Sequence, residues 1–229
     1  MNKTLILAAA AALCLAGGAS YAATPYASNV RAAGKAAPAN FARDPTLSVL
    51  YNQQVDDSGI AIVSQMFEAS YSIYDSAGAD DFTVPTGSTW TVKEVEVTGQ
   101  YFNGSGPASS ENVTFYKVKN GLPKKAVGTY TAVKGKDSHG SFTIKLKPAM
   151  KLKAGTYFVS VQANLTYAGG GGEWGWESTT TSQSFGNSAA WENPGNGFAT
   201  NCTTWAVEDV CIADGQGPDH LFSLLGSSK

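Results

Sequence analysis

The chain has 229 residues, a formal net charge of −2 at pH 7 and a charged fraction of 15%, which is low beside the roughly 25% of typical domains. Glycine, threonine and aromatic residues take up the difference, a composition typical of strands and turns in a protein outside the cell. Because the net charge is slightly negative and arginine is nearly absent, we expect no nucleic-acid partner.

The first 23 residues predict a secretory signal peptide. A short positive start precedes an apolar run over residues 5–15, and small residues then lead to cleavage after Ala22 or Ala23. The apolar run is shorter than the roughly 20 residues that a spanning helix needs. We therefore expect a mature chain without a membrane span, secreted or held in the periplasm.

Residues 24–46 are rich in alanine and proline and poor in large apolar side chains. This composition predicts a flexible arm, followed by one folded domain over 47–229.

Period-two alternation dominates that domain. Phe142, Ile144 and Leu146 alternate with polar residues, and a second alternating run covers residues 157–165. Between them, Pro148 and Gly155 indicate turns. The apolar phase of "WTVKEVEVTGQYF" changes near Lys93, which predicts a β-bulge.

Further strands are expected around residues 60–67, 81–84, 113–118, 126–133 and 221–225, with an Asn120-Gly121 turn between two of them. Many short strands at this spacing favour an all-β fold, an antiparallel β-sandwich of jelly-roll type. A closed barrel is the alternative.

Lysine is unevenly distributed. Residues 117–153 hold ten lysines and a single acid, Asp137, whereas residues 154–228 hold seven acids and no lysine or arginine. The lysines are interpreted as guards of strand edges and wet faces. The alternative is a dipolar molecule whose acidic half meets cations or polar ligands.

Catalytic patterns are weak. His139 and His220 lie in no nucleophile or metal motif and are interpreted as loop or surface histidines. The adjacent carboxylates of Asp80 and Asp81 point to opposite faces of a strand. Glu173 and Glu177 are the one candidate glycosidase pair, at roughly 13 Å between Cα atoms on one face of a strand, and we expect no enzymatic activity.

The segment "GGGGEWGWESTTT" places Trp174 and Trp176 on the same face of a predicted strand. Two indoles in this arrangement are either core or a strip on which a sugar ring can stack. The polar residues Glu173, Glu177 and Asn193 could bond the sugar hydroxyls. These five residues are the predicted ligand-binding site.

The C-terminal segment contains Cys202 and Cys211, an even pair expected to form a disulfide in an exported chain. Asp209, Asp214 and Asp219 offer oxygen ligands that suit calcium. Their spacing matches no defined loop, so solvated turn acids are the default, no cofactor is expected, and calcium stays open.

Three segments carry a family resemblance: "ADDFTVPTGSTWTVKEVEVTG", "LKAGTYFVSVQANL" and "AAWENPGNGF…CTTW…C…DHLFSLLG". They resemble a β-sandwich domain family of exported bacterial proteins with D-D-F-x-V-P and D-x-x-F-x-L-x-G strands. The resemblance covers residues 47–226 and implies export and a shared core that includes Phe82, Trp90, Tyr157, Phe222 and Leu224.

The sequence therefore predicts a secreted, non-catalytic binding module for a glycan or another extracellular polymer. Its partner would be an extracellular polysaccharide or a surface protein. The alternatives are a structural or interaction protein of the bacterial envelope or matrix and, less well supported, a glycoside hydrolase.

Overall fold

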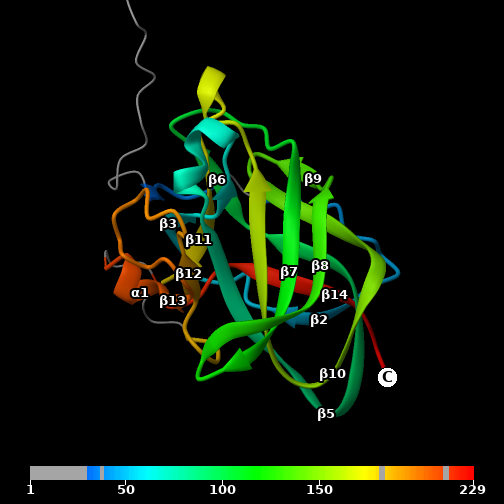
Figure 1. The fold of residues 1–229 in the computed structure, drawn as a ribbon. Helices are drawn as coiled ribbons and strands as arrows, with labels where there is room; N and C mark the ends of the chain where they lie inside the picture. Colours follow the sequence, from blue (N-terminus) through cyan, green and yellow to red (C-terminus); the bar gives the residue numbers. More distant parts are fainter. Residues whose placement is uncertain (1–29, 37–38, 181–183, 214–216) are drawn as a thin grey trace, which may run out of the picture.

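The regular secondary structure of the described residues consists mainly of antiparallel strands, as expected for a β-sandwich. A computed structural model describes residues 30–36, 39–180, 184–213 and 217–229, and the predicted signal peptide lies outside these residues. The strands form two sheets, visible in Figure 1 as a smaller group around β3, β11 and β6 and a larger group that contains β5, β7, β8 and β10.

The smaller sheet has four strands in the order β1-β3-β11-β6. Their bounds are β1 (Arg31–Ala33), β3 (Asp57–Val63), β11 (Glu173–Thr179) and β6 (Gly99–Phe102).

The larger sheet has ten strands, six of them in the order β13-β12-β5-β10-β7-β8. The bounds of these six are β13 (Ala206–Val207), β12 (Ala190–Glu192), β5 (Ala77–Val97), β10 (Ser141–Asn164), β7 (Ser110–Lys119) and β8 (Leu122–Val133). The other four are β14 (Phe222–Ser228), which pairs with β5 and β2 (Ser48–Asn52), and β4 (Gln65–Met66) and β9 (Lys136–Ser138), which pair with β10.

In the part of the chain that the structure describes, helical structure is confined to short connections. These are two 3-10 turns, Ala69–Tyr74 and Ala168–Gly170, and the four-residue α1 (Glu208–Cys211). Among the described residues, no helix is both long and apolar enough to cross a membrane.

Two long bent strands organise the larger sheet. β10 covers both alternating runs, so Pro148 and Gly155 do not turn the chain back; they lie at or beside two shifts in its pairing register with β5. Register also shifts on either side of Lys93 in β5, against both β10 and β14. The predicted bulge is thus confirmed. The two predicted turns are wrong, because continued pairing with β5 carries the backbone past both residues.

The β7–β8 hairpin turns at Asn120-Gly121, as predicted. Both residues have positive φ, 55° and 74°, the backbone that a two-residue hairpin turn requires and that Asn-Gly adopts readily. This turn places the ends of β7 and β8 beside the loop that precedes β13.

The main core lies between the two sheets. From the smaller sheet, the Trp174 and Trp176 rings enter it, with centroids 5.0 Å from Phe142 and 6.0 Å from Phe222. All five residues that the family resemblance assigned to a shared core are buried in this same cluster: Phe82, Trp90, Tyr157, Phe222 and Leu224. Each fully buried side chain of this size contributes about 1.5–3 kcal/mol.

The segment predicted as a flexible arm is ordered where the structure describes it. Within residues 24–46, Arg31–Ala33 forms β1 and pairs with β3, and Val30 is buried. Further along, the Arg43 guanidinium bonds the buried Glu96 carboxylate at 2.7–2.9 Å. The expectation fails because strand pairing and one ion pair supply the anchoring that the composition lacks.

Candidate functional site

The predicted tryptophan platform is not accessible. Trp174 and Trp176 do project from the same face of β11, but that face is the interior between the sheets, and both side chains are 0% exposed. Their indole N–H groups donate to backbone carbonyls, Trp174 to Gly140 at 2.7 Å and Trp176 to Leu221 at 2.9 Å. No ring face is left for a sugar, so the stacking role predicted for these two residues is wrong.

Glu173 and Glu177 lie on the opposite face of β11, and they too are fully buried. The Asn103 amide donates to Glu173, and the Gln100 amide donates to Glu177 at 2.7 Å. Burial raises the pKa of Glu173 to about 7, and burial beside Asp57 raises that of Glu177 to about 8. Covered by neighbouring chain, neither carboxylate reaches an external ligand, and the predicted role of both in a surface site is wrong.

Asn193, the fifth predicted ligand residue, is a structural amide. Its side chain is fully buried and donates to the carbonyls of Ile73 and Asp75 at 2.9 and 2.8 Å, while the Phe198 N–H donates to its oxygen. These bonds hold the loop that follows β12 against the Ala69–Tyr74 turn, which leaves no polar atom for a ligand.

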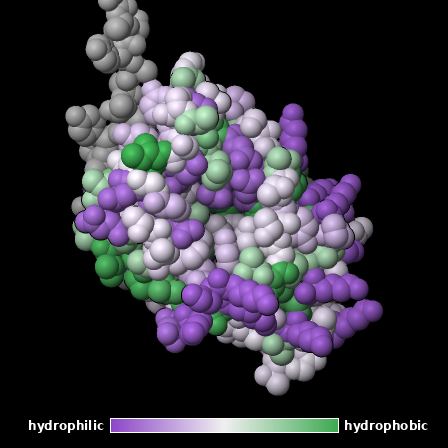
Figure 2. All heavy atoms as spheres, in the orientation of Figure 1, coloured by the Kyte–Doolittle hydropathy of each residue, from purple (hydrophilic) through white to green (hydrophobic). Residues whose placement is uncertain are grey.

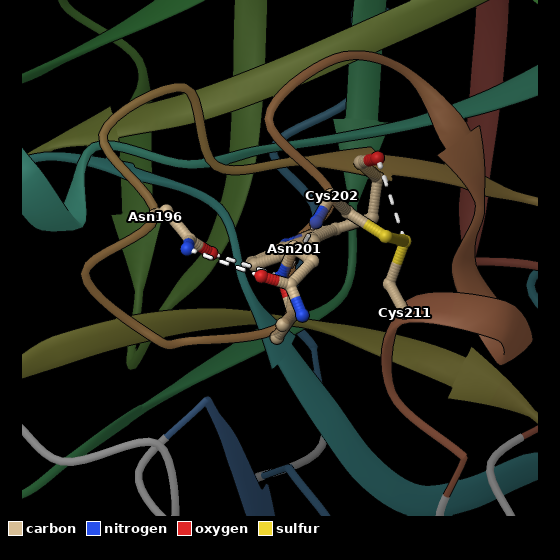
Figure 3. The surroundings of a disulfide bond; sticks show 6 residues. Asn196, Asn201, Cys202 and Cys211 are labelled. Atoms are coloured by element: carbon tan, nitrogen blue, oxygen red, sulfur yellow. Dashed lines mark hydrogen bonds between the residues drawn. A yellow bond between two sulfur atoms is a disulfide. The ribbon is translucent and has the colours of Figure 1, made fainter.

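Cys202 and Cys211 form the predicted disulfide, with the sulfur atoms 2.11 Å apart. Figure 3 shows the bond joining the loop around Asn201 to the end of α1. A bond between Asn196 and Asn201 folds the same loop on itself: the Asn201 N–H donates to the Asn196 side-chain oxygen at 2.9 Å. The disulfide therefore joins the two ends of the segment between the cysteines, and the Asn196–Asn201 bond tightens the loop just before it.

The structure adds no geometric support for the calcium site considered above. Asp214 lies outside the described residues, Asp209 is exposed at α1, and Asp219 is buried and accepts a bond from the Phe185 N–H. Within the described ranges, no group of three or more His, Cys, Asp or Glu side chains could hold a metal ion.

His220 is a core residue, and its interpretation as a loop or surface histidine is wrong. It is fully buried, with Nε2 3.1 Å from the Glu208 carboxylate. Its backbone N–H donates to Asp80, which also accepts from the Gln53 amide. The Asp81 carboxylate has a different partner, the Asn187 amide. The side chains of the two adjacent aspartates thus bind different groups, as predicted from their opposite directions on a strand. This cluster pins the start of β14 to β5.

One tryptophan of the five is left outside the core. Trp90, Trp174, Trp176 and Trp191 are buried, whereas Trp205 is partly exposed. Its ring lies edge-on to Tyr116, with centroids 5.6 Å apart, on the outer side of the larger sheet.

Trp205 lines a groove of about 530 Å³, here called the Trp205 groove. Glu192 and Thr204 lie on the same side as Trp205, from β12 and from the loop closed by the disulfide. The facing wall is the β7–β8 hairpin.

The hairpin gives this groove a polar rim on an apolar base. Lys119, Asn120 and Lys124 are exposed residues around the turn, and Leu122 and Pro123 lie between them along the chain. An amide, two ammonium groups and an indole thus border one hollow, a combination that can both stack and form hydrogen bonds.

Glu192 supplies the acceptor in the groove. Burial raises its pKa to about 7, although the backbone N–H of Trp205 donates to the carboxylate and opposes the shift. Near neutral pH the group is therefore present in both protonation states, as a charged acceptor or as a neutral donor and acceptor.

The sequence analysis did not assign Trp205 to the binding site. The available signal was its position: it follows two threonines and lies between the two cysteines. A residue in a crosslinked surface loop has little room to fold inward. Trp174 and Trp176 lie instead in a strand, and the sequence does not show which face of that strand is buried.

Comparisons with known proteins support the fold. No family model matches the chain, and no curated protein matches it. Among solved structures, it is similar to the crystal structure of the cysteine protease and lectin-like domains of Cwp84, a surface-layer-associated protein of Clostridium difficile, at 12% identity and a TM-score of 0.50. The similarity covers 82% of this chain and 36% of that chain, and at this identity it shows the fold alone.

Proposed function

We propose that the protein is an extracellular, non-catalytic binding module that holds a polysaccharide in the Trp205 groove. The observation that carries the proposal is that the one tryptophan outside the core borders a groove together with a carboxylate, an amide and two ammonium groups. The function expected from the sequence is kept, while the site moves from β11 to the loop between the cysteines.

The physical argument rests on the two faces of a sugar ring. Its C–H face is apolar and packs against an indole, and its hydroxyls need donors and acceptors around the edge. Trp205 offers the aromatic surface, Glu192 the acceptor and Asn120 both kinds of group. A ligand in this groove removes apolar surface from water while its hydroxyls stay bonded.

Rigidity adds to the argument. The disulfide closes the loop that carries Trp205, and β13 pairs with β12 directly after it. A ring that is already held in place loses little conformational freedom on binding, which favours affinity.

Two further observations support an extracellular binding role. The disulfide is of a kind found in oxidising compartments, and the similar solved structure includes a lectin-like domain of a surface-layer-associated protein. The predicted signal peptide and the resemblance to an exported β-sandwich family fit the same location. The burial of Glu173 and Glu177 weakens the hydrolase alternative.

The test uses the selective exposure of Trp205. Acrylamide should quench Trp205 much more than the four buried indoles, and a bound polysaccharide should protect it. We would titrate the protein with neutral polysaccharides (β-glucan, xylan, galactomannan) and follow quenching and affinity electrophoresis. Trp205→Ala should abolish both signals. The matched control is Tyr167→Ala, another partly buried aromatic, which lies against Tyr71 and away from the groove.

Saturable protection that is lost in Trp205→Ala and kept in Tyr167→Ala would support the proposal. Binding that survives Trp205→Ala would contradict this site, and no binding to any polymer in the panel would contradict the function. Self-association that weakens with salt, with no glycan binding, would favour the structural or interaction role instead.

A further inference from the structure

A second groove lies apart from the Trp205 groove and is lined by four lysines. It has a volume of about 740 Å³, and its described lining contains Lys134, Lys136, Lys145 and Lys147 and no acidic residue. We propose that this lysine groove binds the anionic groups of an acidic polysaccharide, a glycan that carries carboxylate or sulfate groups. The inference does not rest on the Trp205 groove, since the two sites share no residue.

The fold places these lysines by simple alternation. In β10 the side chains of Phe142, Ile144 and Leu146 enter the core, so Lys145 and Lys147 point outward. On the neighbouring strand, Lys136 begins β9 opposite Thr143 of β10, and Lys134 precedes it by two residues.

The segment before β2 forms the other wall. The Ala42 N–H donates to the Thr143 hydroxyl at 3.2 Å, which fixes this segment across β10. The groove is therefore a channel between the ordered N-terminal segment and the β8–β9 connection.

Three of the acids close to the channel, Glu94, Glu96 and Glu111, are buried or paired. The Glu96 carboxylate is held by two guanidinium nitrogens of Arg43. Glu94 is fully buried, and its pKa is raised, chiefly by burial and then by Glu96, with Lys145 opposing the shift. Glu111 accepts the Gly135 N–H, and its pKa is raised to about 7, chiefly by burial. Asp44 interacts with Lys145 and has a lowered pKa, but it does not line the groove, so the four lining lysines dominate the potential there.

The four lysines make no ion pair within 4 Å in the part of the chain that the structure describes. Guarding a sheet edge does not explain Lys145, because β10 lies inside the sheet, between β5 and the strands β7 and β9. Like charges around one hollow repel each other, and a multivalent anion would relieve that repulsion.

A second, smaller hollow adjoins the lysine groove. This hollow of about 250 Å³ shares Lys145 and Lys147 and adds Lys93, together with the acidic residues Asp44 and Glu94. In Figure 2, hydrophilic side chains stand out from the side of the molecule where β7, β8 and β10 lie. The smaller hollow is thus mixed in charge, and the repeated positive charges that suit a polyanion are those of the four lysines in the larger groove.

A polysaccharide fits better than a nucleic acid. No aromatic side chain is among the described residues that line the groove, so bases have no ring on which to stack. The chain as a whole carries a net charge of −2, which disfavours a long, highly charged duplex outside the groove.

The test compares a groove variant with a matched surface variant of the same charge. The groove variant combines Lys134→Gln, Lys136→Gln and Lys145→Gln. The control combines Lys125→Gln, Lys151→Gln and Lys153→Gln, three exposed lysines that do not line the groove. Binding to polygalacturonate, dextran sulfate, uncharged dextran and a DNA duplex is measured by isothermal titration calorimetry at low and at high salt.

We expect the wild type to bind at least one of the two acidic polysaccharides. Its affinity for uncharged dextran should be lower than its affinity for that acidic polysaccharide. The groove variant should lose about tenfold or more in affinity and the control less than about twofold, with weaker binding at high salt because exposed charges are screened. The carboxylate and sulfate arms identify the anionic group.

An equal loss of affinity in both variants would show that binding depends on general surface charge, and it would overturn the proposal. The absence of binding at low salt, or tighter binding of the DNA duplex than of the acidic polysaccharides, would also overturn it. Trp205→Ala should leave this affinity unchanged. The experiments therefore distinguish a failure of the proposed function at the Trp205 groove from a failure of the proposal that the lysine groove binds an acidic polysaccharide.

Discussion

Trp176 and His220 stack face to face inside the protein, with ring centroids 4.6 Å apart and planes 9° apart. The indole N–H donates to the Leu221 carbonyl, and His220 Nε2 lies 3.1 Å from the Glu208 carboxylate. The two stacked rings thus connect β11, the residues before β14 and α1. Trp176 serves the stability of the fold.

We therefore predict that Trp176→Ala lowers the free energy of unfolding by about 3–5 kcal/mol, the usual cost of a cavity left by a large buried aromatic. Trp205→Ala should cost much less, about 1 kcal/mol, because its ring is partly exposed. Urea denaturation followed by circular dichroism measures both. Equal losses in the two variants would contradict the assignment of one ring to the core and the other to the surface.

Because the carboxyl groups of Glu173 and Glu177 are buried, we predict that the stability of the protein falls as pH rises. The pKa of Glu177 is raised from 4.5 to about 8, first by burial and then by Asp57, and that of Glu173 to about 7. The folded state holds these protons more tightly than the unfolded state, so the stabilisation is complete below pH 4.5 and is lost as pH rises through 7 and 8. Calorimetric Tm should fall between pH 5 and pH 8.

Glu177→Gln should remove part of this pH dependence. At roughly 1.4 kcal/mol per pKa unit, a pKa raised from 4.5 to about 8 corresponds to about 5 kcal/mol in full, so the variant should gain up to about 4 kcal/mol relative to wild type at pH 8 and little at pH 5. The control is Asp56→Asn, which removes the same charge from an exposed residue. A wild-type Tm that rises over this range would contradict the prediction.

The disulfide should stabilise both the fold and the Trp205 groove. Cys202 and Cys211 are nine residues apart, and closing a loop of this length stabilises by about 2–3 kcal/mol, mainly through the unfolded chain. The double variant Cys202→Ser/Cys211→Ser should lose this amount in denaturation experiments and bind the Trp205-groove polysaccharide more weakly. Unchanged binding would mean that the loop is held by β13 pairing alone.

Local alternation was sufficient to predict much of the fold. The outward direction of Lys145 and the bulge at Lys93 follow from side-chain period, and the hairpin turn follows from the backbone that Asn120-Gly121 adopts readily. These features depend on a few neighbouring residues. The β1 strand was missed because its stability comes from β3, which is distant in sequence.

The candidate site was harder to predict, because alternation shows which residues share a face and does not show which face is covered. Trp174 and Trp176 were correctly placed together, but their burial is set by Phe142 and Phe222 on the other sheet. Likewise, Lys134 and Lys145 form one groove only because β9 pairs with β10. Such facts depend on packing across sheets.

Binding in the Trp205 groove should depend on pH through Glu192. Its pKa is raised to about 7 by burial, so raising the pH from 6 to 8 converts it from a neutral acid to a carboxylate. A carboxylate accepts stronger, charge-assisted hydrogen bonds from sugar hydroxyls. With a neutral polysaccharide, which does not itself titrate, affinity should rise about threefold over this range, given the roughly doubled strength of such bonds.

Glu192→Gln keeps the shape of the side chain and cannot ionise, so its affinity should stay flat with pH and lie near the wild-type value at pH 6. Glu68→Gln is a matched control at a glutamate outside the groove, which accepts the backbone N–H groups of Tyr167 and Ala168, and its binding should follow the wild-type profile. Calorimetric titrations at pH 6, 7 and 8 give all three curves. A pH-dependent affinity in Glu192→Gln would assign the titration to another group and remove Glu192 from the site.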